Sequence, residues 1–227
     1  MSEERGAQAL VAGLLAGIVA LAACSPSSEF ASSGPAVSSE RFVPSTWNFD
    51  RDAVGSLPSG ATIFTGTWTV RIESGAPSSP NALCQTASAE FPAVQLSSDV
   101  HADMAVSAQF KPISGRTDQA AGVLLRIQDS RNYYIVRANA LEGNVVIFKY
   151  VNGQRSEIKS GSINVASGAW QLLRGEAVGT TLRGFVGDKL VVESKDATFR
   201  EGRAGLWTKA DSVTCFDDVM LGPVGSP

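Results

Sequence analysis

Residues 121–152 constrain the fold most, because they alternate between apolar and polar side chains over three short segments. Each segment is rich in β-branched and aromatic residues, and the turns between them carry the Asp, Ser and Gly of tight turns. The three segments are 121–128, 132–140 and 144–151. The polar side chains that interrupt them are Arg126, Gln128, Arg137, Asn139 and Lys149. The pattern predicts three consecutive strands with one face turned to solvent or to a ligand.

The rest of the chain repeats this pattern. Residues 66–73 and 102–110 alternate with period two, and Asn152-Gly153 is typical of a two-residue hairpin turn. No long apolar repeat of helical period follows the N-terminal 23 residues. About a dozen short strands predict an all-β fold, a two-sheet antiparallel jelly-roll sandwich. Further strands are expected at 154–163, 170–178, 182–186, 189–194 and 202–209. The expected first strand, 47–50, and the expected last strand, 213–221, each carry a Phe-Asp pair, and we expect them to be neighbours.

The N-terminal 23 residues have the form of an export signal. An apolar run at 9–20 is followed by small residues and Cys24, and it is shorter than the roughly 20 residues that a membrane span needs. Leu21-Ala22-Ala23-Cys24 resembles the bacterial lipobox, in which the cysteine carries a lipid after cleavage. The resemblance implies lipidation at Cys24 and anchoring outside the cytoplasm, in the bacterial cell envelope. The alternatives are a plain signal peptide with a chance cysteine, or an uncleaved anchor.

Composition divides the remaining chain in two. Residues 24–45 are rich in Ser, Pro and Ala, which predicts a flexible tether. Residues 46–222 are long enough for one sandwich domain. The formal net charge is −3 and no basic stripe is present, so we expect no nucleic acid partner.

Cys84 and Cys215 remain once Cys24 is assigned to lipid. Disulfides persist outside the cytoplasm, and a bridge between these two residues would link distant parts of the domain. The alternative is a pair of separate buried thiols.

A family resemblance rests on motifs spread over about residues 47–222. They include 121–126, 132–134, 137–139, 187–190, 205–212 and 216–218. The chain resembles the concanavalin A-like lectin/glucanase (laminin G-like) sandwiches. Within them it is most similar to bacterial domains grouped with 3-keto-disaccharide hydrolases, which are described as family 16 glycoside hydrolase-like. The resemblance implies two curved sheets with a concave face for carbohydrate, and some members with a structural Ca²⁺ where the first and last strands meet.

The candidate ligand-binding residues are Arg126, Arg137, Asn139 and Trp207. Sugar sites combine an aromatic plane with planar donors that bind hydroxyl groups in pairs, and these residues supply both. The alternative is that the aromatic residues belong to the core and that Arg126 lies on a solvated outer face.

Catalytic and metal motifs are sparse. The Glu-x-Asp-x-x-Glu strand of true family 16 enzymes is absent, and His101 is the sole histidine, without a nucleophile-elbow serine. Calcium is the more plausible metal, with Asp50, Asp217 and Asp218 as candidate ligands. The alternative is that these residues cap strand ends and loops.

Three functions follow in order of preference. The first is a membrane-tethered carbohydrate-binding sandwich. The second is a hydrolase that cleaves 3-keto-glycosides or related sugars. The third is a structural envelope lipoprotein.

Overall fold

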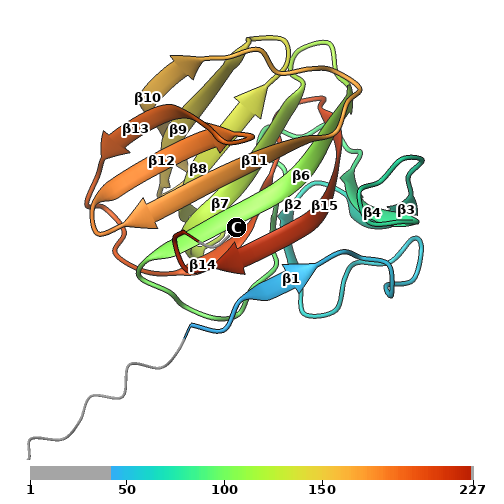
Figure 1. The fold of residues 1–227 in the computed structure, drawn as a ribbon, viewed down its shortest axis with the longest axis horizontal. Helices are drawn as coiled ribbons and strands as arrows, with labels where there is room; N and C mark the ends of the chain where they lie inside the picture. Colours follow the sequence, from blue (N-terminus) through green and yellow to red (C-terminus); the bar gives the residue numbers. More distant parts are fainter. Residues whose placement is uncertain (1–41, 226–227) are drawn as a thin grey trace, which may run out of the picture. The chain divides into compact units, whose positions relative to one another are not determined.

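The computed structural model describes residues 42–225. The described residues form two antiparallel β-sheets and contain no helix (Figure 1). The predicted all-β, two-sheet jelly-roll sandwich is therefore confirmed.

Sheet A contains the first and last strands of the domain. Its order is β13-β12-β11-β6-β15-β4-β3, and β1 pairs with β15. The bounds are β1 Ser45–Trp47, β3 Trp68–Ile72, β4 Asn81–Gln85, β6 Met104–Ser114, β11 Gln171–Val178, β12 Thr181–Val186, β13 Lys189–Lys195 and β15 Val213–Gly222.

Sheet B contains the three-strand block that dominates the sequence. Its order is β10-β9-β8-β7-β14-β5-β2. The bounds are β2 Thr62–Thr65, β5 Ala93–Gln95, β7 Ala120–Asp129, β8 Asn132–Asn139, β9 Asn144–Val151, β10 Gln154–Ser162 and β14 Arg203–Trp207. In Figure 1, β6, β11 and β12 lie in front of the sheet B strands.

The main core lies between the two sheets. Because neighbouring residues of a strand point to opposite faces, β7 sends Val123 and Leu125 into this core while Leu124 lies on the other face. Tyr134 and Val136 of β8 join the core in the same way. The alternation read from the sequence therefore corresponds to two different environments.

The outer face of sheet B carries a second hydrophobic cluster, here called the outer apolar layer. Its buried members are Ala93, Ala120, Leu124, Ile127, Tyr133, Ile135, Val146, Phe148 and Trp207. Phe64, Phe91 and Tyr150 pack against it and are partly buried. Sheet B is thus apolar on both faces over much of its width, which accounts for the near-continuous apolar runs of β7 and β8.

The first and last strands are neighbours, as predicted. Ser45 lies opposite Leu221 and Trp47 opposite Val219. The opening strand is Ser45–Trp47 instead of the expected 47–50, because Phe49 adopts a positive φ of 62° and turns the chain. The strands β2 and β5 were not expected from the sequence.

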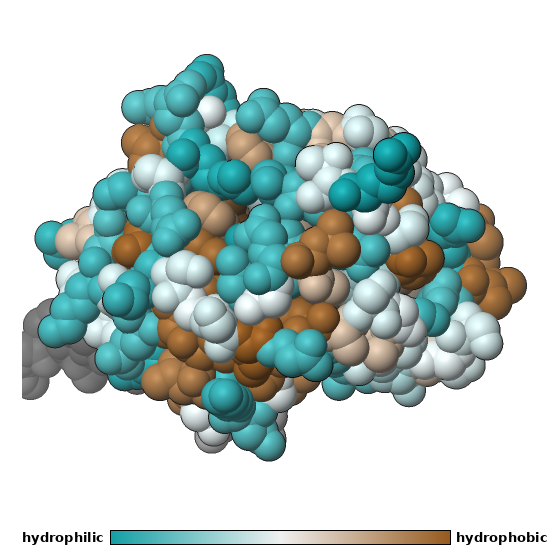
Figure 2. Space-filling model, turned by 90° about the horizontal axis from the view of Figure 1, so that it is seen from above, coloured by the Kyte–Doolittle hydropathy of each residue, from teal (hydrophilic) through white to brown (hydrophobic). Residues whose placement is uncertain are grey.

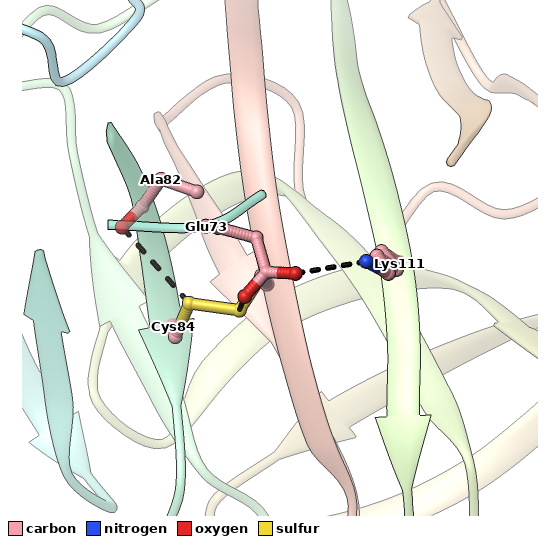
Figure 3. Close-up of a disulfide and its surroundings, with 5 residues drawn as sticks. Glu73, Ala82, Cys84 and Lys111 are labelled. Atoms are coloured by element: carbon pink, nitrogen blue, oxygen red, sulfur yellow. Dashed lines mark hydrogen bonds and ion pairs between the residues drawn. A yellow bond between two sulfur atoms is a disulfide. The ribbon is translucent and has the colours of Figure 1, made fainter. Parts of the chain in front are cut away.

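A disulfide joins Cys84 to Cys215, which confirms the predicted bridge. The two residues face each other on the adjacent strands β4 and β15, and both are buried. Figure 3 shows Glu73 beside the bridge, bonded to Lys111 Nζ at 2.8 Å. The bridge spans 131 residues of sequence. In the loop-entropy treatment it stabilises the fold by about 5 kcal/mol.

Apolar side chains on the surface are scattered over several elements. A view from above Figure 1 shows hydrophilic residues interspersed with smaller hydrophobic areas (Figure 2). Among the described residues, no helix is long and apolar enough to cross a membrane. The predicted signal peptide 1–23, Cys24 and most of the tether 24–45 lie outside the described residues.

Candidate functional site

The structure brings three of the four candidate ligand residues together on the outer face of sheet B. Arg137 and Asn139 lie on β8, and Trp207 ends β14. Trp207 lies opposite Gly122 of β7, and Gly122 lies opposite Arg137 of β8. Trp207, Gly122 and Arg137 therefore form one row across the sheet. The side chains of Arg137, Asn139 and Trp207 are buried.

Gly122 makes room for the indole ring in this row. A Cβ atom added at Gly122 would lie 3.2 Å from Trp207 Cβ and Cε3, and 3.3 Å from Ile135 Cγ2. Such distances are tighter than ordinary packing, so a larger residue would displace the ring. The Ala121-Gly122 motif in the sequence therefore has a structural reason.

A polar cluster surrounds the end of this row. We define the polar cluster as Asp118, Arg137, Asn139, Glu142 and Lys209. Asn139 Nδ2 donates to Asp118 Oδ1 at 2.7 Å and to Glu142 Oε1 at 3.1 Å. Arg137 Nη2 donates to Glu142 Oε2 at 2.9 Å, and Lys209 Nζ lies 2.9 Å from Asp118 Oδ2. Two carboxylates and two cations thus converge on one buried amide.

Glu142 connects the buried part of the cluster with solvent. Its side chain is 40% exposed, whereas that of Asp118 is 1% exposed. Burial on its own would raise the pKa of Glu142, but the hydrogen bond and charge of Arg137, with help from Asn144 and Lys209, lower this pKa below its ordinary value. Glu142 is therefore held as a carboxylate that accepts hydrogen bonds.

Arg155 of β10 reaches across the outer apolar layer. Its Cζ atom lies 4.4 Å from the ring centroid of Phe148, 4.7 Å from that of Phe91 and 5.7 Å from that of Trp207. Arg137 Cζ lies over the same Phe148 ring at 5.5 Å. Burial is the main cause that lowers the pKa of Arg155. The nearby positive charge of Arg137 lowers this pKa further.

Several donors of these two arginines are buried without a partner. Arg137 Nε and Nη1 and Arg155 Nη1 make no hydrogen bond among the residues that the structure describes. A buried N–H without an acceptor costs about 1–3 kcal/mol. These nitrogen atoms have almost no accessible surface, so they lie out of reach of a ligand in this structure.

Arg126, the fourth candidate, lies elsewhere. Its φ is 53°, and the pairing of β7 with β8 shifts register between Leu125 and Asp129. This bulge gives the outer-face position to Ile127. Arg126 instead donates to the backbone oxygens of Ala102 at 2.9 Å, Gly179 at 2.8 Å and Phe199 at 2.9 Å. In this structure Arg126 ties loops together, away from the polar cluster.

Two of the three candidate calcium ligands, Asp217 and Asp50, accept hydrogen bonds from the protein itself. Asp217 accepts bonds from Ser78 N, Ser78 Oγ and Asp218 N, all at 2.7 Å, and Asp50 accepts one from Asn81 N at 3.1 Å. Burial raises the pKa of Asp217 in spite of these bonds. Asp218 is exposed. A Ca²⁺ ion takes six to eight oxygen ligands, and three carboxylate oxygens of these candidates already accept bonds from the protein. Calcium binding stays a prediction.

Sequence reasoning did not single out Asp118, Arg155 or Phe91. Asp118 lies in the segment before β7, and Phe91 lies just before β5, a strand that the pattern did not reveal. Arg155 follows the Asn152-Gly153 turn and lies opposite Tyr150 of β9. The hairpin turn in the sequence is therefore the signal that could have placed Arg155 on this face.

Comparison with solved structures finds the same type of sandwich fold in several proteins. The carbohydrate-binding module CBM66 from Bacillus subtilis matches with a TM-score of 0.62 and 23% identity, over 72% of this chain and 95% of that one. The β-glucanase of Bacillus licheniformis matches with a TM-score of 0.52 and 11% identity, over 82% and 99%. A β-1,3-1,4-glucanase from a mouse hindgut metagenome gives 0.52 and 12%, over 81% and 100%.

These likenesses define the class of fold. The domain is a two-sheet jelly-roll sandwich, and its fold is similar to those of a carbohydrate-binding module and two glucanases. No protein-family model and no curated protein matches the sequence.

Proposed function

We propose that this domain binds carbohydrate on the outer face of sheet B. The observation that carries the proposal is the polar cluster, in which the Glu142 side chain is 40% exposed, beside the partly buried rings of Phe91 and Tyr150. Sugar recognition needs an aromatic surface for C–H groups and fixed polar groups for hydroxyls. Trp207 and Arg137 are buried and support this surface, since Trp207 stacks on Phe91 and Arg137 bonds Glu142.

The carboxylates of this face suit binding better than hydrolysis. A retaining glycosidase has two carboxyl groups about 5 Å apart, one of them held protonated by a raised pKa. Asp118 and Glu142 both bond Asn139 Nδ2, so their oxygens are close. The pKa of Glu142 is lowered, however, and Asp118 is paired with Lys209. Neither carboxylate is placed as a general acid, and hydrolysis is the second candidate function.

The test is a binding titration of the full-length protein with oligosaccharides of β-1,3-1,4-glucan, the polymer named for one of the similar structures. We expect saturable binding, with Kd raised more than about tenfold by Arg137→Ala or Glu142→Gln. Lys159→Ala removes an exposed cation from the neighbouring strand β10 and is the matched control. Unchanged affinity in both cluster variants, or no binding, would contradict the proposal.

The same samples distinguish binding from catalysis. We expect the oligosaccharide to be recovered uncleaved by chromatography after prolonged incubation. Release of a shorter sugar by the wild-type protein, abolished in Glu142→Gln, would favour the hydrolase instead.

The proposal includes the location predicted from residues 9–24. A lipidated Cys24 would hold the domain on the bacterial envelope, outside the cytoplasm. Metabolic labelling with a fatty acid, compared between the wild type and Cys24→Ser, tests this. We expect label and membrane recovery only in the wild type.

A further inference from the structure

A cavity of about 590 Å³ opens on the outer face of sheet A, the sheet that does not carry the polar cluster. Its size lies within the range of about 300–1,000 Å³ that is common for ligand sites. Strands β1, β6, β11 and β15 and the β12–β13 turn contribute to its lining. We propose that this cavity is a second carbohydrate-binding site, for neutral sugars, that is independent of the site on sheet B.

The hollow arises because short residues lie between two raised walls. Ser107 and Gln109 of β6 lie in the middle of the sheet, opposite Arg174 and Leu172 of β11. One wall is β1, a three-residue strand in which Thr46 lies opposite Met220 on the cavity side, while Trp47 lies opposite Val219 and packs against the core. The ligand would thus meet a polar floor beside the apolar side chains of Leu172 and Met220.

The opposite wall is the β12–β13 turn. Gly187 adopts a positive φ of 55° and its N–H bonds the carbonyl oxygen of Leu172 at 2.9 Å. This bond fixes the turn against β11 and places Asp188 at the cavity. On the other side, a register shift in β15 between Asp217 and Met220 leaves Asp218 exposed at the cavity, with a φ of 44°. Two acidic side chains are therefore positioned by the backbone on both sides of the hollow.

The polar groups of the lining are available to a ligand. In the described part of the chain, Gln109, Asp188 and Asp218 make no side-chain hydrogen bond. Arg174 is held in place, since its Nη1 donates to Glu176 Oε1 at 2.7 Å and its Cζ lies 4.1 Å from the Phe185 ring centroid. An amide, two carboxylates and an oriented guanidinium beside the apolar Leu172 and Met220 match the alternating hydroxyl and C–H surfaces of a sugar.

Charge selects a neutral sugar over an acidic one. Asp188 and Asp218 outnumber Arg174 in the lining, and Glu176 already compensates the guanidinium. A carboxylated or sulfated sugar would meet net repulsion, which disfavours it.

The test follows the side-chain methyl signal of Met220 by NMR in the full-length protein, assigned with Met220→Leu. The probes are a neutral glucose tetrasaccharide and a galacturonic acid tetrasaccharide. We expect the neutral sugar to shift this signal saturably and the acidic sugar to leave it unchanged. Gln109→Ala should raise the Kd read from this signal at least about tenfold. Lys189→Ala, an exposed neighbour outside the lining, is the matched control.

The two sites are separated by a variant on the other sheet. Arg137→Ala should leave the Met220 titration unchanged, whether or not it abolishes binding at the polar cluster. The inference is overturned if the neutral sugar does not move the signal, if Gln109→Ala leaves the Kd unchanged, or if the acidic sugar binds equally well. It is also overturned if Arg137→Ala abolishes the shift.

Discussion

The outer faces of the two sheets carry similar residues but use them differently. On sheet B, the Asn139 amide donates to both Asp118 and Glu142, and most of this cluster is buried. On sheet A, Gln109 and Asp188 line an open cavity and make no side-chain hydrogen bond among the described residues. Residue type alone therefore does not show whether a polar side chain supports the fold or can bind a ligand. The hydrogen bonds already made decide which role a side chain can have.

Removal of the Cys84–Cys215 disulfide of sheet A should have the largest effect on the free energy of unfolding. Replacing the bridge by Cys84→Ser/Cys215→Ser should lower the free energy of unfolding by about 2–5 kcal/mol. Urea denaturation without reductant measures it, and the reduced wild-type protein should behave like the variant. A denaturation midpoint equal to that of the oxidised wild type would show that sheet A does not depend on this link.

The polar cluster gives the next largest effect. Asp118→Ala removes the acceptor of Asn139 and the partner of Lys209, and the buried amide then lacks a bond. We expect a loss of about 2 kcal/mol in the free energy of unfolding. Asp188→Ala on sheet A should change it by less than about 0.5 kcal/mol. If the two variants were equally stable, the contrast between the faces would be removed.

Acid should weaken sheet B through Glu142. Its pKa is lowered in the folded protein, so its contribution is present above the ordinary carboxyl pKa and is lost as pH falls through the folded value. The stability of the wild type should therefore fall below about pH 4, and Glu142→Gln should fall less steeply in this window. Melting temperatures at a series of pH values measure the slopes. Parallel curves would exclude Glu142 as a source of acid sensitivity.

Calcium should have the smallest effect. Because the oxygens of Asp217 already accept bonds from Ser78 and Asp218, we expect Tm in excess CaCl₂ and in EDTA to agree within about 1 °C. A clear rise with CaCl₂, absent in Asp217→Asn, would instead support the calcium site inferred from the sequence.

Much of the fold was predictable from alternation. Strands β6 to β13 follow the expected segments closely, because period-two patterns and Gly-containing turns are local properties. The strands β2 and β5 were missed because they have only four and three residues, too few for a pattern. The outer apolar layer was also unexpected, since one face of sheet B was predicted to be polar.

The candidate site was predictable only in part. Arg137, Asn139 and Trp207 share a face because regular alternation holds on β8 and β14. Alternation places Arg126 on the wrong face, because a single bulge after Leu125 exchanges the two faces of β7. Asp118 reaches Asn139 through tertiary structure, 21 residues away in sequence. No local pattern indicates such a contact.

The pairing of Ser45 with Leu221 has a practical consequence for rearranging the gene. Since the two ends of the sandwich are adjacent, a short glycine-rich linker could join them, and new termini could be opened at the exposed Asn152-Gly153 hairpin. A circular permutant of this kind would keep every strand in its place while moving the point of attachment to the far end of sheet B.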